Sequence, residues 1–437
     1  MKTSMVSSIN WIWRIWATRI SPWFWALGDQ GVVSLGTFLL SVILARALPP
    51  SEYGIFVLIV GLFNFLNSLH SALVVIPATT RGARAELAEL RQTTSGALIL
   101  TLLLILPQGA IVGLATWAMG RPELTLWAIL VTILWQFQET IRRTFMIRLK
   151  HREAAWGDII SYLGRAALAW AWTSRGQISV KEALVIMALT SGIAALMQIV
   201  QHGLTWMPLS EVRRLALAYW NLGRWVLMTN SVALFLIQAY PWGLAFFFST
   251  AAAAEYQAAG NILGMTHPIE FGIGGLIYPA VARARTDHGE QEAARVGFRH
   301  ALQGGCLLLP FHLTLLLWPQ GVLRLFYGAD SPYLGLTGIL RLFVLCYVLG
   351  YTANILVVIL NSLERTRVAF LAQLASALTT LFVGLPMIAW AGVIGATIAG
   401  GLTSLVRLTA AGFFIKQTQA AANKIVTVMS HQGSAAD

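Results

Sequence analysis

The chain has 437 residues, of which 57% are hydrophobic, 11% are aromatic and 11% are charged, and its formal net charge is +12. A soluble domain carries about 25% charged residues, so these figures exclude a soluble enzyme, and they equally exclude a disordered chain. The two cysteines, Cys306 and Cys346, lie in apolar stretches, so no disulfide framework and no cysteine-based metal site is expected. The composition predicts an all-α integral membrane protein.

The chain begins with a segment, 1–27, that is rich in Trp and interrupted by Arg14, Arg19 and Pro22. It has no cleavage site typical of a signal peptide, and we expect it to lie at the membrane interface as a helix. A spanning helix needs about 20 mostly apolar residues. Twelve such stretches follow, and a count of 11 or 13 stays open: 28–48, 54–77, 93–117, 124–146, 157–174, 182–205, 225–248, 258–281, 301–320, 334–360, 368–390 and 393–415.

The basic residues predict the orientation of these spans. With both termini in the cytoplasm, 22 of the 30 Lys and Arg residues lie on the inner side and only 5 on the outer side, as the positive-inside rule requires. The positive charge therefore indicates membrane topology and no nucleic-acid partner. We expect a multi-pass protein of the bacterial inner membrane, ending in a cytoplasmic tail at 416–437.

Three dipeptides recur at an offset of 202 or 203 residues, which indicates an internal repeat. They are Glu52-Tyr53 with Glu255-Tyr256, Pro77-Ala78 with Pro279-Ala280, and Leu106-Pro107 with Leu309-Pro310. The repeat predicts two pseudo-symmetric six-helix bundles around a central cavity, at 28–205 and 225–415, joined by a cytoplasmic linker at 206–224. A substrate path between such halves is typical of transporters.

Several motifs of enzymes are missing from the sequence. It has no GxxxxGK[ST] phosphate loop and no paired His or Cys spacing typical of zinc sites. No loop between the predicted spans is longer than about 20 residues, whereas a glycan polymerase or ligase usually needs a large outer loop. We therefore expect a transporter without an enzymatic activity, a metal or a cofactor, although coupling to a H⁺ or Na⁺ gradient is open.

Two segments carry a resemblance to a known family. LARALPPSEYGIF, at the end of the first span, and LRLFYGADSPYLGLTGILRLFV, between the ninth and tenth spans, resemble bacterial polysaccharide flippases of the Wzx type. These belong to the multidrug/oligosaccharidyl-lipid/polysaccharide exporter superfamily. The second half departs from the pattern, since Gln257 follows Glu255-Tyr256 where the first half has Gly54.

The resemblance implies translocation of an undecaprenyl-diphosphate-linked oligosaccharide by alternating access, for the assembly of lipopolysaccharide or exopolysaccharide. Its partners would be the lipid-linked oligosaccharide, the bilayer and other membrane proteins of polysaccharide assembly. The alternatives are a multidrug or cation antiporter of the same superfamily and a glycan polymerase or ligase. A peptidoglycan-precursor flippase would be expected to have two further spans.

Three arginines, Arg165, Arg341 and Arg407, fall inside predicted spans. An ionised side chain in the membrane is costly and normally faces a cavity or a partner, and the planar guanidinium suits phosphate oxygens. These arginines are candidates for binding a diphosphate; the alternative is snorkelling or structural pairing. Asn64, Asn67 and His70 form a polar stripe on one helix face that could line the cavity or join helices.

Glu270 lies mid-span close to His267 and Pro268, with glycines following. Because Pro breaks the helical hydrogen-bond ladder, these three residues are candidates for gating or for coupling to a proton or cation; the alternative is a packing kink. Among the other acids, Glu139 is expected to pair with Arg142 and Arg143 one turn away. Asp29 and Asp158 are expected to be hydrated at the inner interface.

Overall fold

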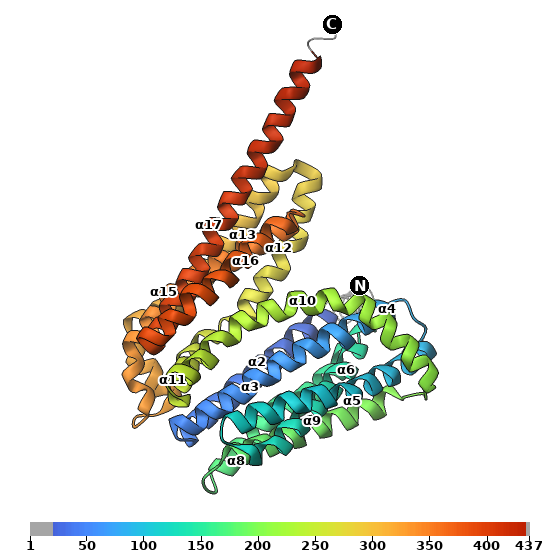
Figure 1. The fold of residues 1–437 in the computed structure, drawn as a ribbon, viewed down its shortest axis with the longest axis vertical. Helices are drawn as coiled ribbons and strands as arrows, with labels where there is room; N and C mark the ends of the chain where they lie inside the picture. The colour runs from blue at the N-terminus through green and yellow to red at the C-terminus, as the bar shows by residue number, and fades with distance from the viewer. Residues whose placement is uncertain (1–20, 434–437) are drawn as a thin grey trace, which may run out of the picture. The chain divides into compact units, whose positions relative to one another are not determined.

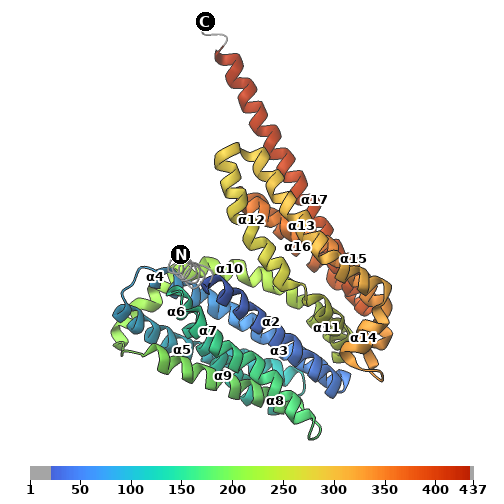
Figure 2. The same ribbon diagram turned by 180° about the vertical axis from the view of Figure 1, so that it is seen from behind.

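The structure is a computed structural model that describes residues 21–433. Most of the interfacial helix expected at 1–27 therefore lies outside the described residues. The described chain folds into helices only (Figures 1 and 2), which confirms the all-α prediction. It divides into two compact units, Met1–Gln238 and Ala239–Asp437, with the boundary inside helix α10, Leu209–Phe247. The stretch 206–224, expected to be a linker, is consequently helical from Leu209 onward.

The first unit is built around helix α6, which packs against both α5 and α9, while α2 packs against α7 and α8. Its elements are α2 Ser21–Ala47, α3 Pro50–His70, η2 Ser71–Val75, α4 Ile76–Gly82, α5 Leu87–Ala118, η3 Pro122–Leu124, α6 Thr125–Ile147, α7 His151–Asp158, η4 Ile159–Leu163, α8 Gly164–Thr173 and α9 Val180–His202, followed by α10.

In the second unit α12 packs against α13 and α15, and α17 packs against α15 and α16. Its elements are α11 Thr250–Gly264, α12 His267–His288, α13 Glu290–Leu317, α14 Pro319–Tyr327, η5 Pro332–Leu336, α15 Thr337–Ser362, α16 Thr366–Thr379, η6 Thr380–Gly384 and α17 Leu385–Gly433. Within α17, Gly392 has φ 54° and ψ −131°, which is the break expected between the eleventh and twelfth spans.

Eight helical stretches in the described chain are long and apolar enough to cross a membrane. The last of them, Thr366–Phe413, holds two of the predicted spans because it includes the break at Gly392. The three predicted spans outside these stretches fall on α7–η4–α8, on α10, and on α11 with α12. These helices are shorter, more polar or interrupted, and together with the eight stretches they account for about twelve spans.

The same turn occurs at the same place in both units. Leu149, after α6, and Glu364, after α15, have φ of 55° and 60°, although neither is a glycine. In both turns the next amide donates to a carbonyl five residues back, from Lys150 to Phe145 and from Arg365 to Leu360, each at 2.9 Å. Since a side chain at positive φ is unusual, its recurrence in equivalent loops supports the internal repeat.

One loop outside the spans is held in place by two ion pairs. Arg121, between α5 and η3, donates to Glu52 at the start of α3 and to Glu123, each at 2.5 Å. These hydrogen bonds raise the pKa of the Arg121 guanidinium. Glu52 belongs to the repeated Glu-Tyr pair, and this contact gives it a structural role in joining α3 to the loop.

Candidate functional site

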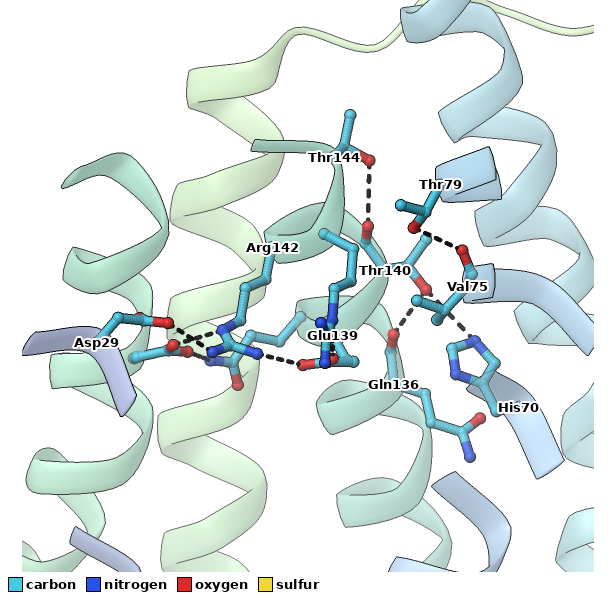
Figure 3. Close-up of polar contacts among 12 residues, drawn as sticks. Asp29, His70, Val75, Thr79, Gln136, Glu139, Thr140, Arg142 and Thr144 are labelled. Atoms are coloured by element: carbon cyan, nitrogen blue, oxygen red, sulfur yellow. Dashed lines mark hydrogen bonds and ion pairs between the residues drawn. The ribbon is translucent and has the colours of Figure 1, made fainter. Parts of the chain in front are cut away.

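A cluster of charged side chains lies buried inside the first unit, around Arg142 of α6. The guanidinium donates to Asp158 at 2.5 Å, to Asp29 at 2.6 Å and to Glu139 at 3.1 Å. Figure 3 shows Arg142 between Asp29 and Glu139. Arg143 donates to Glu139 from the other side, at 2.5 Å. We call these five residues the Arg142 cluster.

The cluster confirms one interpretation of the sequence and corrects another. Glu139 pairs with Arg142 and Arg143 as the spacing indicates. The expectation that Asp29 and Asp158 are hydrated at the interface is wrong, since only 1% and 0% of these residues is exposed. They are buried because α7 packs against both α2 and α6, and both carboxylates are directed at the same guanidinium.

On the other side of α6 a chain of uncharged polar groups reaches α3 (Figure 3). His70 is fully buried, and its Nε2 lies 2.9 Å from the hydroxyl of Thr101 and 3.3 Å from that of Thr140. Thr140 in turn donates to the carbonyl of Gln136 at 2.8 Å. Buried polar groups are stable only when hydrogen-bonded, so this chain joins α3, α5 and α6 inside the unit.

Arg165 forms no ion pair with the Arg142 cluster, although Asp158 of that cluster lies close enough to interact with its charge. It lies in the first turn of α8, and only 4% of the residue is exposed. Its guanidinium lies 4.1 Å from the ring centroid of Tyr162, and Nη2 donates to the hydroxyl of Thr37 at 3.1 Å. Nε is buried without a hydrogen-bond partner among the described residues, and no carboxylate of the described chain forms an ion pair with Arg165.

Close packing of α2 on the π-helical segment η4 positions Tyr162 beneath Arg165. A Cβ at Gly36 of α2 would lie 2.5 Å from the backbone carbonyl of Tyr162. We call Arg165, Tyr162 and Thr37 the Arg165 site. The site therefore depends on a glycine as well as on its polar groups.

We expect Gly36→Ala to lower the free energy of unfolding by about 1–3 kcal/mol, because the added methyl group forces two backbones apart. Thermal unfolding in detergent measures this effect. Gly31→Ala is the matched control on the same helix, since a Cβ there meets no atom within 4 Å and replacing Gly by Ala inside a helix favours folding by up to about 1 kcal/mol. Equal stability of the two variants would contradict the close approach at Gly36.

The other two candidate arginines lie in the second unit and differ from Arg165. Arg341 is exposed, and its Nε donates to the carbonyl of Leu316 at the end of α13, at 2.9 Å. This contact is typical of a cation at a helix C-terminus. Arg407 is half-buried, donates weakly to Gln373 at 3.4 Å, and has a buried Nε without a partner among the described residues.

The remaining candidates lie on α3 and α12. Asn64 is exposed, whereas Asn67 is half-buried and its Oδ1 has no partner in the described chain. Pro268 lies in the first turn of α12, beside His267. Glu270 is half-buried next to Tyr347 of α15, a neighbour that the sequence does not indicate.

No protein-family model matches the sequence, and no curated protein matches it either. Solved structures are similar in fold at 14% identity. An inward-facing multidrug resistance MATE family transporter of the MOP superfamily matches with a TM-score of 0.74, over 90% of this chain and 96% of that one. The lipid II flippase MurJ, in an inward closed conformation, matches with a TM-score of 0.69, over 89% of this chain and 86% of that one.

A third structure is a MOP superfamily transporter from Pyrococcus furiosus, in which the reverse polarity of the binding pocket suggests a different function. It matches with a TM-score of 0.59 over 90% of this chain and 94% of that one, also at 14% identity. These similarities show that the chain has the fold of MATE and MurJ transporters. With its apolar helices, this fold makes the protein a multi-pass membrane protein.

Proposed function

We propose that this protein translocates an undecaprenyl-diphosphate-linked oligosaccharide across the bacterial inner membrane by alternating access, for surface polysaccharide biosynthesis. The observation that carries the proposal is Arg165, a buried cation that forms no ion pair among the described residues and has an unpartnered Nε. A charge held inside a membrane protein without a counter-ion is costly, and an anionic substrate would remove that cost when it binds.

The chemistry of the Arg165 site suits a diphosphate. The guanidinium is planar and permanently charged, and it matches the spacing of phosphate oxygens better than a Lys ammonium does. Tyr162 holds one face of the guanidinium and Thr37 one of its nitrogens, which leaves Nε as a donor. In the second unit, Arg407 likewise has a buried Nε without a partner among the described residues.

An antiporter of cationic drugs is the second candidate, because the fold is also that of a multidrug MATE transporter. A cationic substrate would need a free acidic group. In the first unit Asp29, Glu139 and Asp158 are all occupied by Arg142, and Glu139 also by Arg143. In the second unit Glu255 on α11 and Glu270 on α12 are half-buried and form no ion pair with a described basic residue, so this candidate depends on the second unit alone.

The two candidates are separated by reconstituting the protein into liposomes that contain a fluorescent undecaprenyl-diphosphate-linked oligosaccharide. We expect the oligosaccharide to become accessible to an external glycosidase faster than in empty liposomes, and the matching monophosphate to move more slowly, since it has fewer oxygens for the cations. A protein that leaves the oligosaccharide in place but transports a cationic dye would contradict the proposal.

A further inference from the structure

Three basic side chains of the first unit lie where three of its helices begin or end. Arg91 is in the second turn of α5, Lys150 is in the turn between α6 and α7, and His202 is the last residue of α9. The Nε of Arg91 donates to the backbone carbonyl of His202 at 3.0 Å. Arg91 and Lys150 both lie close enough to the His202 ring to act on its charge. We call these three residues the Lys150 site.

The His202 side chain is buried without a hydrogen bond. Only 7% of the residue is exposed, and its Nε2 has no partner among the described residues. The ring packs edge-on against Phe145, with 5.8 Å between the centroids. The carbonyl of Phe145 accepts from the amide of Lys150 at 2.9 Å, so the turn that carries Lys150 lies beside the ring. Because buried polar groups nearly always have a partner, the ring indicates a ligand or a water that the chain itself does not provide.

No acidic residue of the described chain offsets the positive charge of the Lys150 site. Neither Arg91 nor Lys150 forms an ion pair with a described carboxylate, and no carboxylate acts on the charge of the His202 ring. Glu211 of α10 comes close to α5, but it accepts a hydrogen bond from Gln92 at 3.1 Å. The site therefore attracts an anion.

The second unit has the same turn, and there the cation is neutralised. Arg365 follows a residue with positive φ, as Lys150 does, and it donates to Glu290 at the start of α13, at 2.6 Å. The position 203 residues before Glu290 is Leu87, at the start of α5, which carries no charge. The first unit thus lacks the counter-charge that its counterpart has, and this difference favours an anion from outside the chain.

The place of the site along the spans favours a lipid headgroup as the source of that anion. Three helical stretches that can cross a membrane begin or end at the site: Leu87–Ala118, Pro122–Ile147 and Val180–His202. The site is therefore level with the predicted inner surface of the membrane, where anionic lipids attract basic side chains. Large apolar side chains near it in sequence are exposed, among them Leu149 and Trp206. Trp is typical of the headgroup level, and a free phosphate ion would not require an apolar surround.

We propose that the Lys150 site binds the phosphate group of an anionic membrane lipid. The Nε of Arg91 is held by the end of α9, which leaves its two Nη nitrogens to donate to phosphate oxygens. Lys150 adds an exposed ammonium, and His202 adds a donor in the tautomer that carries its proton on Nε2. The bound headgroup would join α5, α9 and the turn after α6, and so stabilise the folded first unit. The proposal holds whatever substrate the protein transports.

Lipid binding is tested on the purified full-length protein in a neutral detergent, by thermal unfolding during a titration with phosphatidylglycerol. We expect a saturable rise in the unfolding temperature, little effect of the zwitterionic phosphatidylcholine, and an apparent affinity about tenfold lower in Lys150→Ala, since hydrogen bonds to charged groups are strong. Arg213→Ala is the matched control, because Arg213 is an exposed cation of α10 without an ion pair. An equal loss in both variants would mean general attraction to a basic surface and would overturn the site.

Soluble glycerol phosphate distinguishes the two sources of a phosphate group. At the same concentration it should leave the unfolding temperature almost unchanged, because it has no acyl chains to hold it at the membrane surface. Stabilisation equal to that by phosphatidylglycerol would assign the site to a free phosphate ester and overturn the lipid assignment.

His202→Phe separates a ligand-binding role of the ring from a structural one. The variant keeps an aromatic ring against Phe145 but removes both nitrogens. Without lipid it should unfold at the wild-type temperature or higher, since a buried polar group without a partner is lost, and the effect of phosphatidylglycerol should shrink. A lower unfolding temperature without lipid, together with an unchanged lipid effect, would show that His202 is structural and would contradict its place in the site. Lys150→Ala carries the test if His202→Phe does not fold, because Lys150 is exposed.

Discussion

Arg165→Ala is expected to abolish export of the lipid-linked oligosaccharide while the protein still inserts into the membrane. Removing one member of a buried charge contact typically costs about 2–5 kcal/mol of binding, which is enough to stop export under most cellular conditions. Stability should change in the opposite direction. Since Arg165 forms no ion pair in the described chain and interacts with Asp158 only from a longer distance, its replacement by an apolar side chain of similar length removes a poorly compensated charge, and Arg165→Met should unfold at the same temperature as the wild type or higher.

This combination separates a substrate-binding residue from a structural one, because a structural arginine would lose stability together with export. Surface glycan labelling measures export, and size-exclusion chromatography after heating measures stability. Arg341→Ala is the control within a span, since Arg341 is exposed and donates only to a backbone carbonyl; its export should remain near wild type. Normal export by Arg165→Ala would remove Arg165 from the proposed substrate site.

The positions of the spans could be predicted from the sequence because each spanning helix must be mostly apolar along its own length, whatever its neighbours are. The break near Gly392 could also be predicted, since a short interruption in a long apolar run marks the end of a span. Gly392 has a positive φ, which favours glycine. The local pairing of Glu139 with Arg142 and Arg143 follows from helical spacing. Each of these features depends on neighbours within one or two turns.

The Arg142 cluster could not be predicted in the same way. Asp29 is 113 residues from Arg142 in sequence, and Asp158 is 16 residues away. Hydropathy places an acid near the end of a span, but it does not say which face of a neighbouring helix meets that acid. The π-helical segment η4 adds a residue to the turn that follows Asp158, and no sequence pattern indicates it. Hydropathy therefore places both aspartates at the membrane interface, whereas the packing of the helices places them in the interior.

Glu270 and its neighbours lie between these cases. Glu270, His267 and Pro268 form a local group that the sequence singles out, whereas His312 and Tyr347 come from other helices. A signal for His312 is present, because it interrupts an otherwise apolar run in α13, and an ionisable residue inside a span is a functional candidate by default. Tyr347 carries no such signal, since a tyrosine is common in apolar helices and at their ends.

Arg142→Leu is expected to lower the free energy of unfolding by about 3–5 kcal/mol, the usual cost of removing one partner from a buried ion pair. Without the guanidinium, Asp29 and Asp158 face each other beside Glu139, and Arg143 reaches only the last of these carboxylates. The variant should therefore unfold at a much lower temperature in detergent or fail to accumulate in the membrane. Arg142→Lys should be intermediate, since one ammonium cannot match the three directions in which the planar guanidinium donates.

Neutralising the stranded acids should reverse the loss. Arg142→Leu combined with Asp29→Asn and Asp158→Asn removes both the charges and their repulsion, and it should recover most of the wild-type unfolding temperature. Arg143→Ala is the matched control on the next position, because 45% of its side chain is exposed and it has one partner; exposed pairs contribute about 0–1 kcal/mol. Arg142→Leu as stable as Arg143→Ala would mean that the carboxylates stay neutral without the guanidinium. In that case the Arg142 cluster would be a proton store rather than a structural joint between α2, α6 and α7.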